Sequence, residues 1–145
     1  MSVSDLDTTT NSHEVATLWF LAARTMAVAG GELPTVQEAA TGLYAQAILG
    51  FSEFDCQKAK LPEQIDNKTL IDCLSGVRQL SKELAEKILT GVMMISYADR
   101  TMTPLEVRWA SMLASAIEVT PDEFQKCCIN ARVIASMLRP QGGQS

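Results

Sequence analysis

Two acidic residues border the stretch of this sequence whose residue types and spacing best suit chemistry. Asp99 stands where one helical pattern ends, and Glu106 falls in the first turn of the next. Carboxylate oxygens are preferred ligands of hard cations such as Ca²⁺. The pair predicts a metal site, with further oxygens from carbonyl groups of the link, water, Thr101 or Thr103, and Glu32.

The same residues also have a purely structural interpretation. Thr103-Pro104-Leu105-Glu106 carries the Ser/Thr-x-x-Glu pattern of a helix capping box, with proline at the first helical position. In such a box the Glu106 carboxylate accepts a hydrogen bond from the Thr103 backbone N–H and needs no metal. At this level both interpretations, metal site and structural corner, stay open.

Other reactive residues give no catalytic pattern. His13 is the single histidine and has no evident acid–base partner, so we expect no enzyme activity and no catalytic residues. The cysteines form no C-x-x-C pair, and Cys127 and Cys128 could react with tellurite or arsenite only if exposed. Several methionines fall at helical spacing and are expected to fill the core rather than bind copper(I): Met93, Met94, Met102, Met112 and Met137.

Composition limits the class of protein. The chain has 145 residues, 47% hydrophobic and 20% charged, with a net charge of −5, which suits one globular domain. It has no block of Lys and Arg, so we expect no nucleic-acid partner. No basic leader and no apolar run of about 20 residues occurs, so we expect a cytoplasmic protein without a membrane span. We predict a flexible N-terminal arm over 1–12, an all-helical domain over 13–139 and a flexible tail over 140–145.

Apolar residues recur every three or four positions along most of the chain, and no run alternates with period two. This predicts an all-α, single-domain bundle of about seven helices. The predicted helices cover approximately 13–29, 35–49, 52–58, 68–78, 81–98, 104–117 and 121–137.

An internal repeat is visible in the apolar positions. The second and sixth predicted helices carry matching inward sets at a constant spacing of 69 residues, with Trp19 and Trp109 as expected core anchors of the two halves. The sets are Val36, Ala40, Leu43, Tyr44, Ala47 and Ile48, and Leu105, Trp109, Met112, Leu113, Ala116 and Ile117. We interpret the order of links, caps and helices as a pseudo-repeat.

The segment Ala98-Asp99-Arg100-Thr101-Met102-Thr103-Pro104-Leu105-Glu106, followed by Val119-Thr120-Pro121-Asp122-Glu123-Phe124, resembles the second half of the TerB-like tellurite-resistance domain. A related domain begins some DnaJ-type co-chaperones. The family motif is approximately Ala-Asp-Gly-x-apolar-x-x-x-Glu, once in each half of a seven-helix bundle. Arg100 replaces the usual glycine here, and the first half has Gly30 and Gln37 in place of the acids.

The resemblance implies a non-enzymatic stress-response protein that acts as a protein-interaction module. It implies other proteins of a stress-response system as partners, and a divalent metal ion such as Ca²⁺ at Asp99 and Glu106, the two acids that match. The oligomeric state is left open, with a homodimer as a candidate. The alternative function is binding of a small apolar ligand or lipid between the two helical halves.

Overall fold

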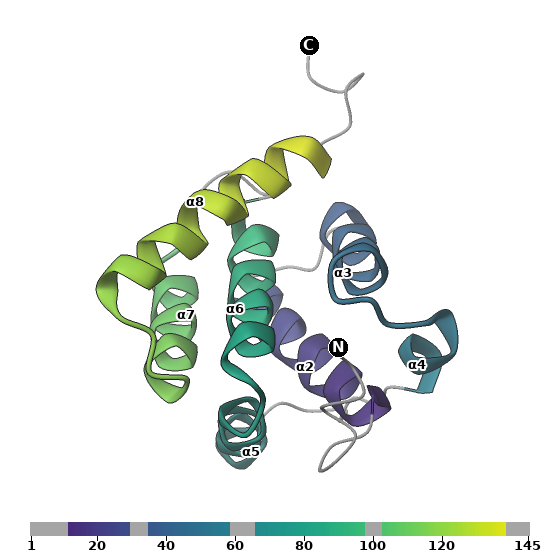
Figure 1. The fold of residues 1–145 in the computed structure, drawn as a ribbon, viewed down its shortest axis with the longest axis horizontal. Coiled ribbons are helices and arrows are strands. Elements are labelled where there is room, and N and C mark those ends of the chain that lie inside the picture. Colours follow the sequence, from purple (N-terminus) through teal and green to yellow (C-terminus); the bar gives the residue numbers. More distant parts are fainter. Residues whose placement is uncertain (1–11, 30–34, 59–65, 98–102, 139–145) are drawn as a thin grey trace.

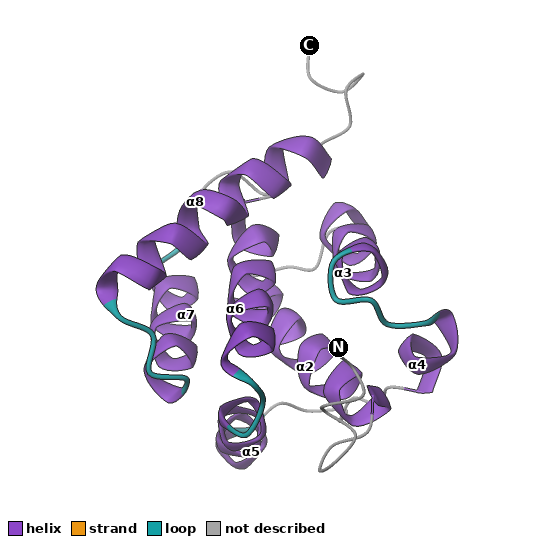
Figure 2. Ribbon diagram, in the orientation of Figure 1, coloured by secondary structure: helices purple, strands orange, loops and turns teal. Residues whose placement is uncertain are grey.

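The computed structural model describes residues 12–29, 35–58, 66–97 and 103–138, and within them it contains seven α-helices and no strand. This confirms the predicted all-α, single-domain bundle (Figures 1 and 2). The helices are α2 (Ser12–Ala29), α3 (Thr35–Ala47), α4 (Glu53–Lys58), α5 (Asn67–Arg78), α6 (Lys82–Tyr97), α7 (Pro104–Ala116) and α8 (Pro121–Leu138).

Side-chain caps set where several of these helices begin. The hydroxyls of Ser52 and Ser81 accept hydrogen bonds from backbone N–H groups three residues later, at the starts of α4 and α6. Asp66, which the sequence prediction placed in a linker, caps α5 by accepting from the Thr69 N–H at 2.8 Å. The end of α3 turns through Gly50, whose φ of +78° favours glycine. Local sequence therefore explains most of the helix boundaries.

The helix contacts repeat between the two halves of the chain. Helices α2 and α6 pack on each other, and α3 and α7 each pack on both of them. Helix α4 packs on α2, as α8 packs on α6, while α5 contacts α2 and α7. The contacts among α2, α3 and α4 are thus similar to those among α6, α7 and α8 (Figure 1). This arrangement agrees with the pseudo-repeat proposed from the sequence.

Burial matches at several repeat-related positions, although Ile48 is exposed and its counterpart Ile117 is buried. Ala40 and Trp109 are both buried, and so are Tyr44 and Leu113. By contrast, Leu43 is exposed, although the sequence pattern placed it inward. Its counterpart Met112 is exposed too, so the two halves share the departure from the predicted pattern.

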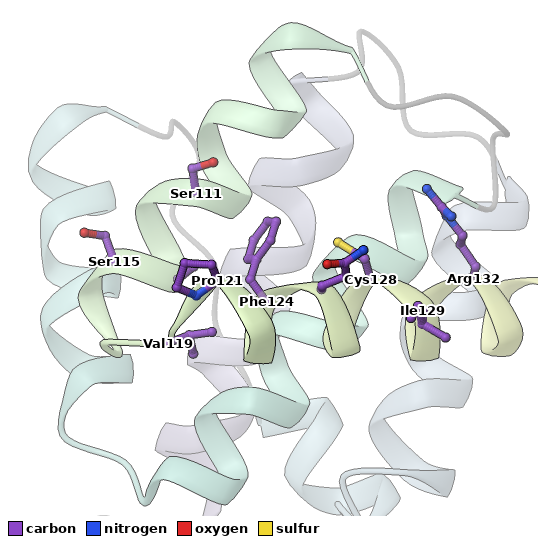
Figure 3. Close-up of a pocket in the computed structure, with 10 residues that line it drawn as sticks. Ser111, Ser115, Val119, Pro121, Phe124, Cys128, Ile129 and Arg132 are labelled. Atoms are coloured by element: carbon purple, nitrogen blue, oxygen red, sulfur yellow. The ribbon is translucent and has the colours of Figure 1, made fainter.

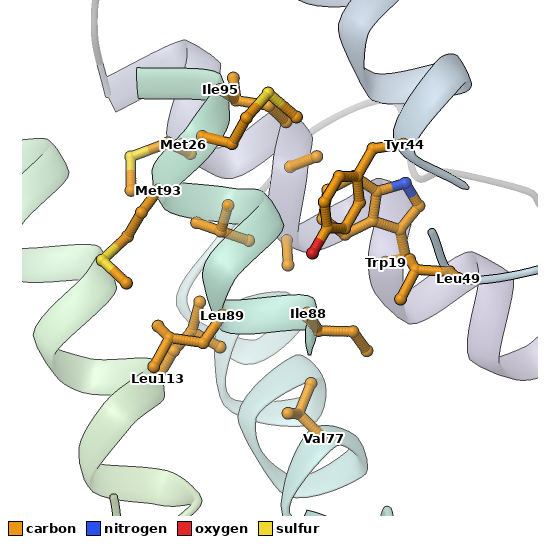
Figure 4. Packing of buried hydrophobic residues seen from close by; sticks show 14 of the residues in the cluster. Trp19, Met26, Tyr44, Leu49, Val77, Ile88, Leu89, Met93, Ile95 and Leu113 are labelled. Carbon is orange, nitrogen blue, oxygen red and sulfur yellow. The ribbon is translucent and has the colours of Figure 1, made fainter. Parts of the chain in front are cut away.

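The core lies around α6, which is buried on every side over its second half (Figure 4). The sequence predicted one inward face for this helix. The structure also buries Thr90 and Gly91, because α2, α3, α7 and α8 all pack on α6, and it buries Met93 and Met94, which were expected to fill the core. Trp19 and Trp109 are buried, as predicted.

Several residues predicted to point inward are exposed. They lie on the outer helices, which have fewer neighbours than α6 to cover their apolar positions. These corrections apply to Leu43, Ala47, Ile48, Ile71, Leu105, Met112 and Met137. Val36 and Leu138 lie in helices, but their side chains are outside the described residues.

None of the helices in the described ranges is long and apolar enough to cross a membrane.

Candidate functional site

The predicted acidic corner lies at the start of α7, and the structure describes only one of its two acids. Asp99, with Thr101, falls in 98–102, and Glu32 falls in 30–34, both outside the described residues. Glu106 is described and is only 2% exposed. Of the two acids predicted to bind a metal ion, the structure therefore describes the environment of Glu106 alone.

Glu106 forms the capping box that its sequence predicts. Its Oε1 accepts a hydrogen bond from the Thr103 backbone N–H at 2.6 Å, and its own N–H donates to Thr103 Oγ1 at 3.2 Å. Thr120 and Glu123 make the same pair of bonds at the start of α8. A negative side chain in the first helical turn is also favoured by the helix dipole. The structural interpretation of Glu106 is therefore confirmed.

No group of three or more His, Cys, Asp or Glu side chains is placed to hold a metal ion within the described parts of the chain. His13 lies in the first turn of α2, but its side chain is not among those described. A metal at the corner would need Asp99 and backbone oxygens in addition to Glu106.

We expect Glu106→Ala to lower the free energy of unfolding by about 1–2 kcal/mol, because it removes the acceptor for the Thr103 N–H. Glu106→Gln keeps an acceptor oxygen and should cost about 0.5 kcal/mol. Urea unfolding followed by circular dichroism measures both changes. Glu123→Ala, in a more exposed box of the same kind, is the matched control and should cost less than Glu106→Ala. Equal losses from the alanine and glutamine variants at position 106 would contradict the capping role.

The adjacent cysteines of α8 point to different sides of that helix. Cys127 is buried and lines a groove bounded by α3, α6 and α8, whereas Cys128 is half-buried and lines a groove between α7 and α8. Successive residues of a helix diverge by about 100°. The two thiols therefore do not form a chelating pair for arsenite or tellurite.

We expect Cys56 and Cys128 to react with a maleimide in the folded protein, and Cys73 and Cys127 to remain unmodified. The first two are half-buried. Burial raises the pKa of the Cys73 thiol to about 12 and also raises that of Cys127, so both stay protonated near pH 8. Mass spectrometry after a short labelling pulse tests this, with guanidinium-unfolded protein as the control in which all four react. Rapid labelling of Cys73 in folded protein would contradict the packing of α5 on α2.

The groove between the two halves has a volume of about 560 Å³. Tyr44 of α3 and Ile48, which follows the end of α3, form one wall, and α6 and α8 supply the others. Its rim is charged, with the residues Glu83, Glu86, Lys87, Glu123 and Lys126. Lys82 binds Glu123 at 3.1 Å across this rim. The groove is thus open to solvent, with charged side chains among its lining residues and a lining that is more apolar than polar.

The groove between α7 and α8 has a volume of about 590 Å³ (Figure 3). Phe124 and Cys128 of α8 lie between the two helices, and Arg132 stands at one end of the row of lining residues. Its guanidinium carbon is 5.2 Å from the centre of the Tyr97 ring, which comes from α6. Sequence analysis did not single out Arg132 or Tyr97, because their proximity arises from the packing of α8 on α6.

Comparison with protein-family models, with curated proteins and with solved structures finds no match for this chain. The resemblance to the TerB-like domain therefore stays a prediction from the sequence of residues 98–106 and 119–124.

Proposed function

We propose that this chain is a non-enzymatic stress-response protein of the TerB-like type that works as a protein-interaction module. The observation that carries the proposal is an apolar ridge on α8, formed by Ile129, Val133 and Met137. These side chains are 52%, 53% and 66% exposed and recur every four residues, so they share one helix face. Exposed apolar patches commonly mark protein-interaction sites.

The ridge has a position that suits docking. Helix α8 packs against α6 through its opposite face, with Ala131 and Ala135 buried. A partner could therefore cover the ridge without disturbing the core. We propose another protein of a stress-response system as that partner, with a second copy of the chain as the alternative.

The test is recovery of partners from the native host grown with and without tellurite, using tagged full-length protein. We expect Val133→Lys/Met137→Lys to lose the partners that the wild type recovers. Ile71→Lys is the matched control, because Ile71 is equally exposed but lies on α5. Equal recovery by all three proteins would contradict the proposal, and light scattering on the same variants separates self-association from binding of another protein.

The finer part of the proposal is a divalent metal ion such as Ca²⁺ at Asp99 and Glu106. Glu106 already binds the Thr103 N–H through Oε1, so it could offer the metal its other oxygen. Calorimetry with Ca²⁺, Mg²⁺, Zn²⁺ and Mn²⁺ on the wild type and on Asp99→Asn/Glu106→Gln tests this. Absence of binding to the wild type would end the metal proposal and leave the interaction module standing.

Binding of a small apolar ligand or lipid between the halves remains a second candidate, and the groove of α3, α6 and α8 is the observation that favours it. Mass spectrometry of native protein purified without detergent would show a bound lipid if this function holds.

A further inference from the structure

The groove between α7 and α8 combines apolar walls with one charged side chain. Its lining residues are Ser111, Ala114, Ser115, Val119, Pro121, Phe124, Gln125, Cys128, Ile129 and Arg132. The groove is open to solvent and has a volume of about 590 Å³, and apolar side chains supply more of its lining than polar ones. The lining contains no acidic residue, although the chain as a whole carries a net charge of −5.

Arg132 lies against an aromatic ring. Its guanidinium lies over the Tyr97 ring at 5.2 Å, and no ion pair joins it to an acid within the described residues. Burial and the neighbouring Cys128 raise the pKa of the Tyr97 phenol, so near neutral pH the phenol is uncharged and does not cancel the guanidinium. A stacked guanidinium is preorganised to bind a carboxylate through two parallel hydrogen bonds.

The charge of the groove selects among anions. One guanidinium matches a single negative charge. The nearby start of α8 offers little more to an anion, because the Glu123 carboxylate already accepts the Thr120 N–H. Beyond Arg132, the side chains of Val119, Pro121 and Phe124 form an apolar wall leading to the α7–α8 corner (Figure 3).

We propose that this groove binds a small monocarboxylate with an unbranched apolar chain, of the fatty-acid class. The carboxylate binds the Arg132 guanidinium, and the chain lies along Phe124 towards Val119 and Pro121. The site lies on the opposite side of α8 from the groove between the halves, and it does not depend on the proposed interaction with a partner through the apolar ridge.

Cys128 provides an internal reporter of occupancy. Its half-buried thiol lines the groove, with Sγ 3.6 Å from Met93 Sδ. A chain lying along Phe124 would cover it and slow its alkylation. Cys56 is the other half-buried thiol, so a Cys56→Ser background leaves Cys128 as the accessible cysteine among the four.

The experiment is calorimetry on the full chain with decanoate below its micelle concentration. Butyrate tests the need for the apolar chain, and decyltrimethylammonium tests the need for the negative charge. We expect binding of decanoate alone. Arg132→Gln should weaken it at least about tenfold, because it removes a charge-assisted pair of hydrogen bonds.

Two further variants keep the test decisive. Arg108→Gln removes an exposed arginine of α7 that does not line the groove, and it should leave the affinity unchanged. Ser115→Phe, at an exposed position of the groove wall, should block the chain while the helix content stays the same. In the Cys56→Ser protein, decanoate should slow alkylation of Cys128.

Several results would overturn the proposal. Equal binding of the cationic amphiphile would indicate unspecific adsorption. Equal weakening by Arg108→Gln, or unchanged alkylation of Cys128 at saturation, would place the ligand elsewhere. Binding of a peptide through its C-terminal carboxylate without binding of decanoate would assign the groove to a protein partner instead.

Discussion

Replacement of Gly91 by alanine is expected to destabilise the fold by about 3 kcal/mol. A Cβ atom at this position would lie 2.4 Å from Tyr44 Cε2 and 2.6 Å from Trp19 Cη2. Both rings are fully buried and lie against each other, with their centres 5.1 Å apart.

The hydrogen bonds of these rings add to the cost. The Tyr44 hydroxyl donates to the Lys87 carbonyl at 2.7 Å, one turn before Gly91 on α6, and Trp19 Nε1 donates to the Thr41 carbonyl at 3.3 Å. Moving the Tyr44 ring away from a new methyl group would strain or break the first bond. The expected loss therefore combines overpacking with a weakened contact between α3 and α6.

Urea unfolding followed by circular dichroism gives the free energy of unfolding for this variant. Gly42→Ala is the matched control, because Gly42 lies within α3 and an added Cβ there meets nothing within 4 Å. That control should gain about 0.5–1 kcal/mol, since alanine favours a helix over glycine. Wild-type stability of Gly91→Ala would contradict the close approach of α2, α3 and α6.

Replacement of Trp109 by alanine is expected to cost about 3–5 kcal/mol. Trp109 is 4% exposed and joins α7 to α2, with Nε1 donating to the Ala22 carbonyl at 3.1 Å. Its loss would leave a cavity between the second half of the chain and the first. The near-ultraviolet circular dichroism signal and the urea midpoint should fall together.

Trp109→Phe separates the contribution of apolar packing from that of the hydrogen bond to Ala22. Phenylalanine keeps much of the apolar volume but cannot donate to Ala22, so a loss of about 1–2 kcal/mol is expected. The neighbouring Arg108 is exposed, and Arg108→Ala should change the stability by less than about 0.5 kcal/mol. A loss for Trp109→Ala as small as that for Arg108→Ala would show that α7 does not depend on this anchor.

Some features of the candidate sites depend on local sequence, and others depend on the packing of helices far apart in the chain. The capping role of Glu106 was predictable, because it depends on four consecutive residues. The groove of Arg132 was not, since it combines α7 and α8 with a Tyr97 ring from α6. The different directions of Cys127 and Cys128 follow from helix geometry, but which groove each thiol lines depends on the neighbouring helices.

Sequence by itself determined the helix order, most helix starts and the repeated pattern of the two halves. Caps, prolines and glycines act over three or four residues, so their effects on helix boundaries can be predicted from the sequence without knowledge of the fold. Only the tertiary structure decided that α6 is buried on every side, while Leu43, Leu105 and Met112 stay exposed. The helical period fixes the direction of each side chain around its own axis. Whether that direction meets another helix or solvent depends on contacts between residues far apart in the chain.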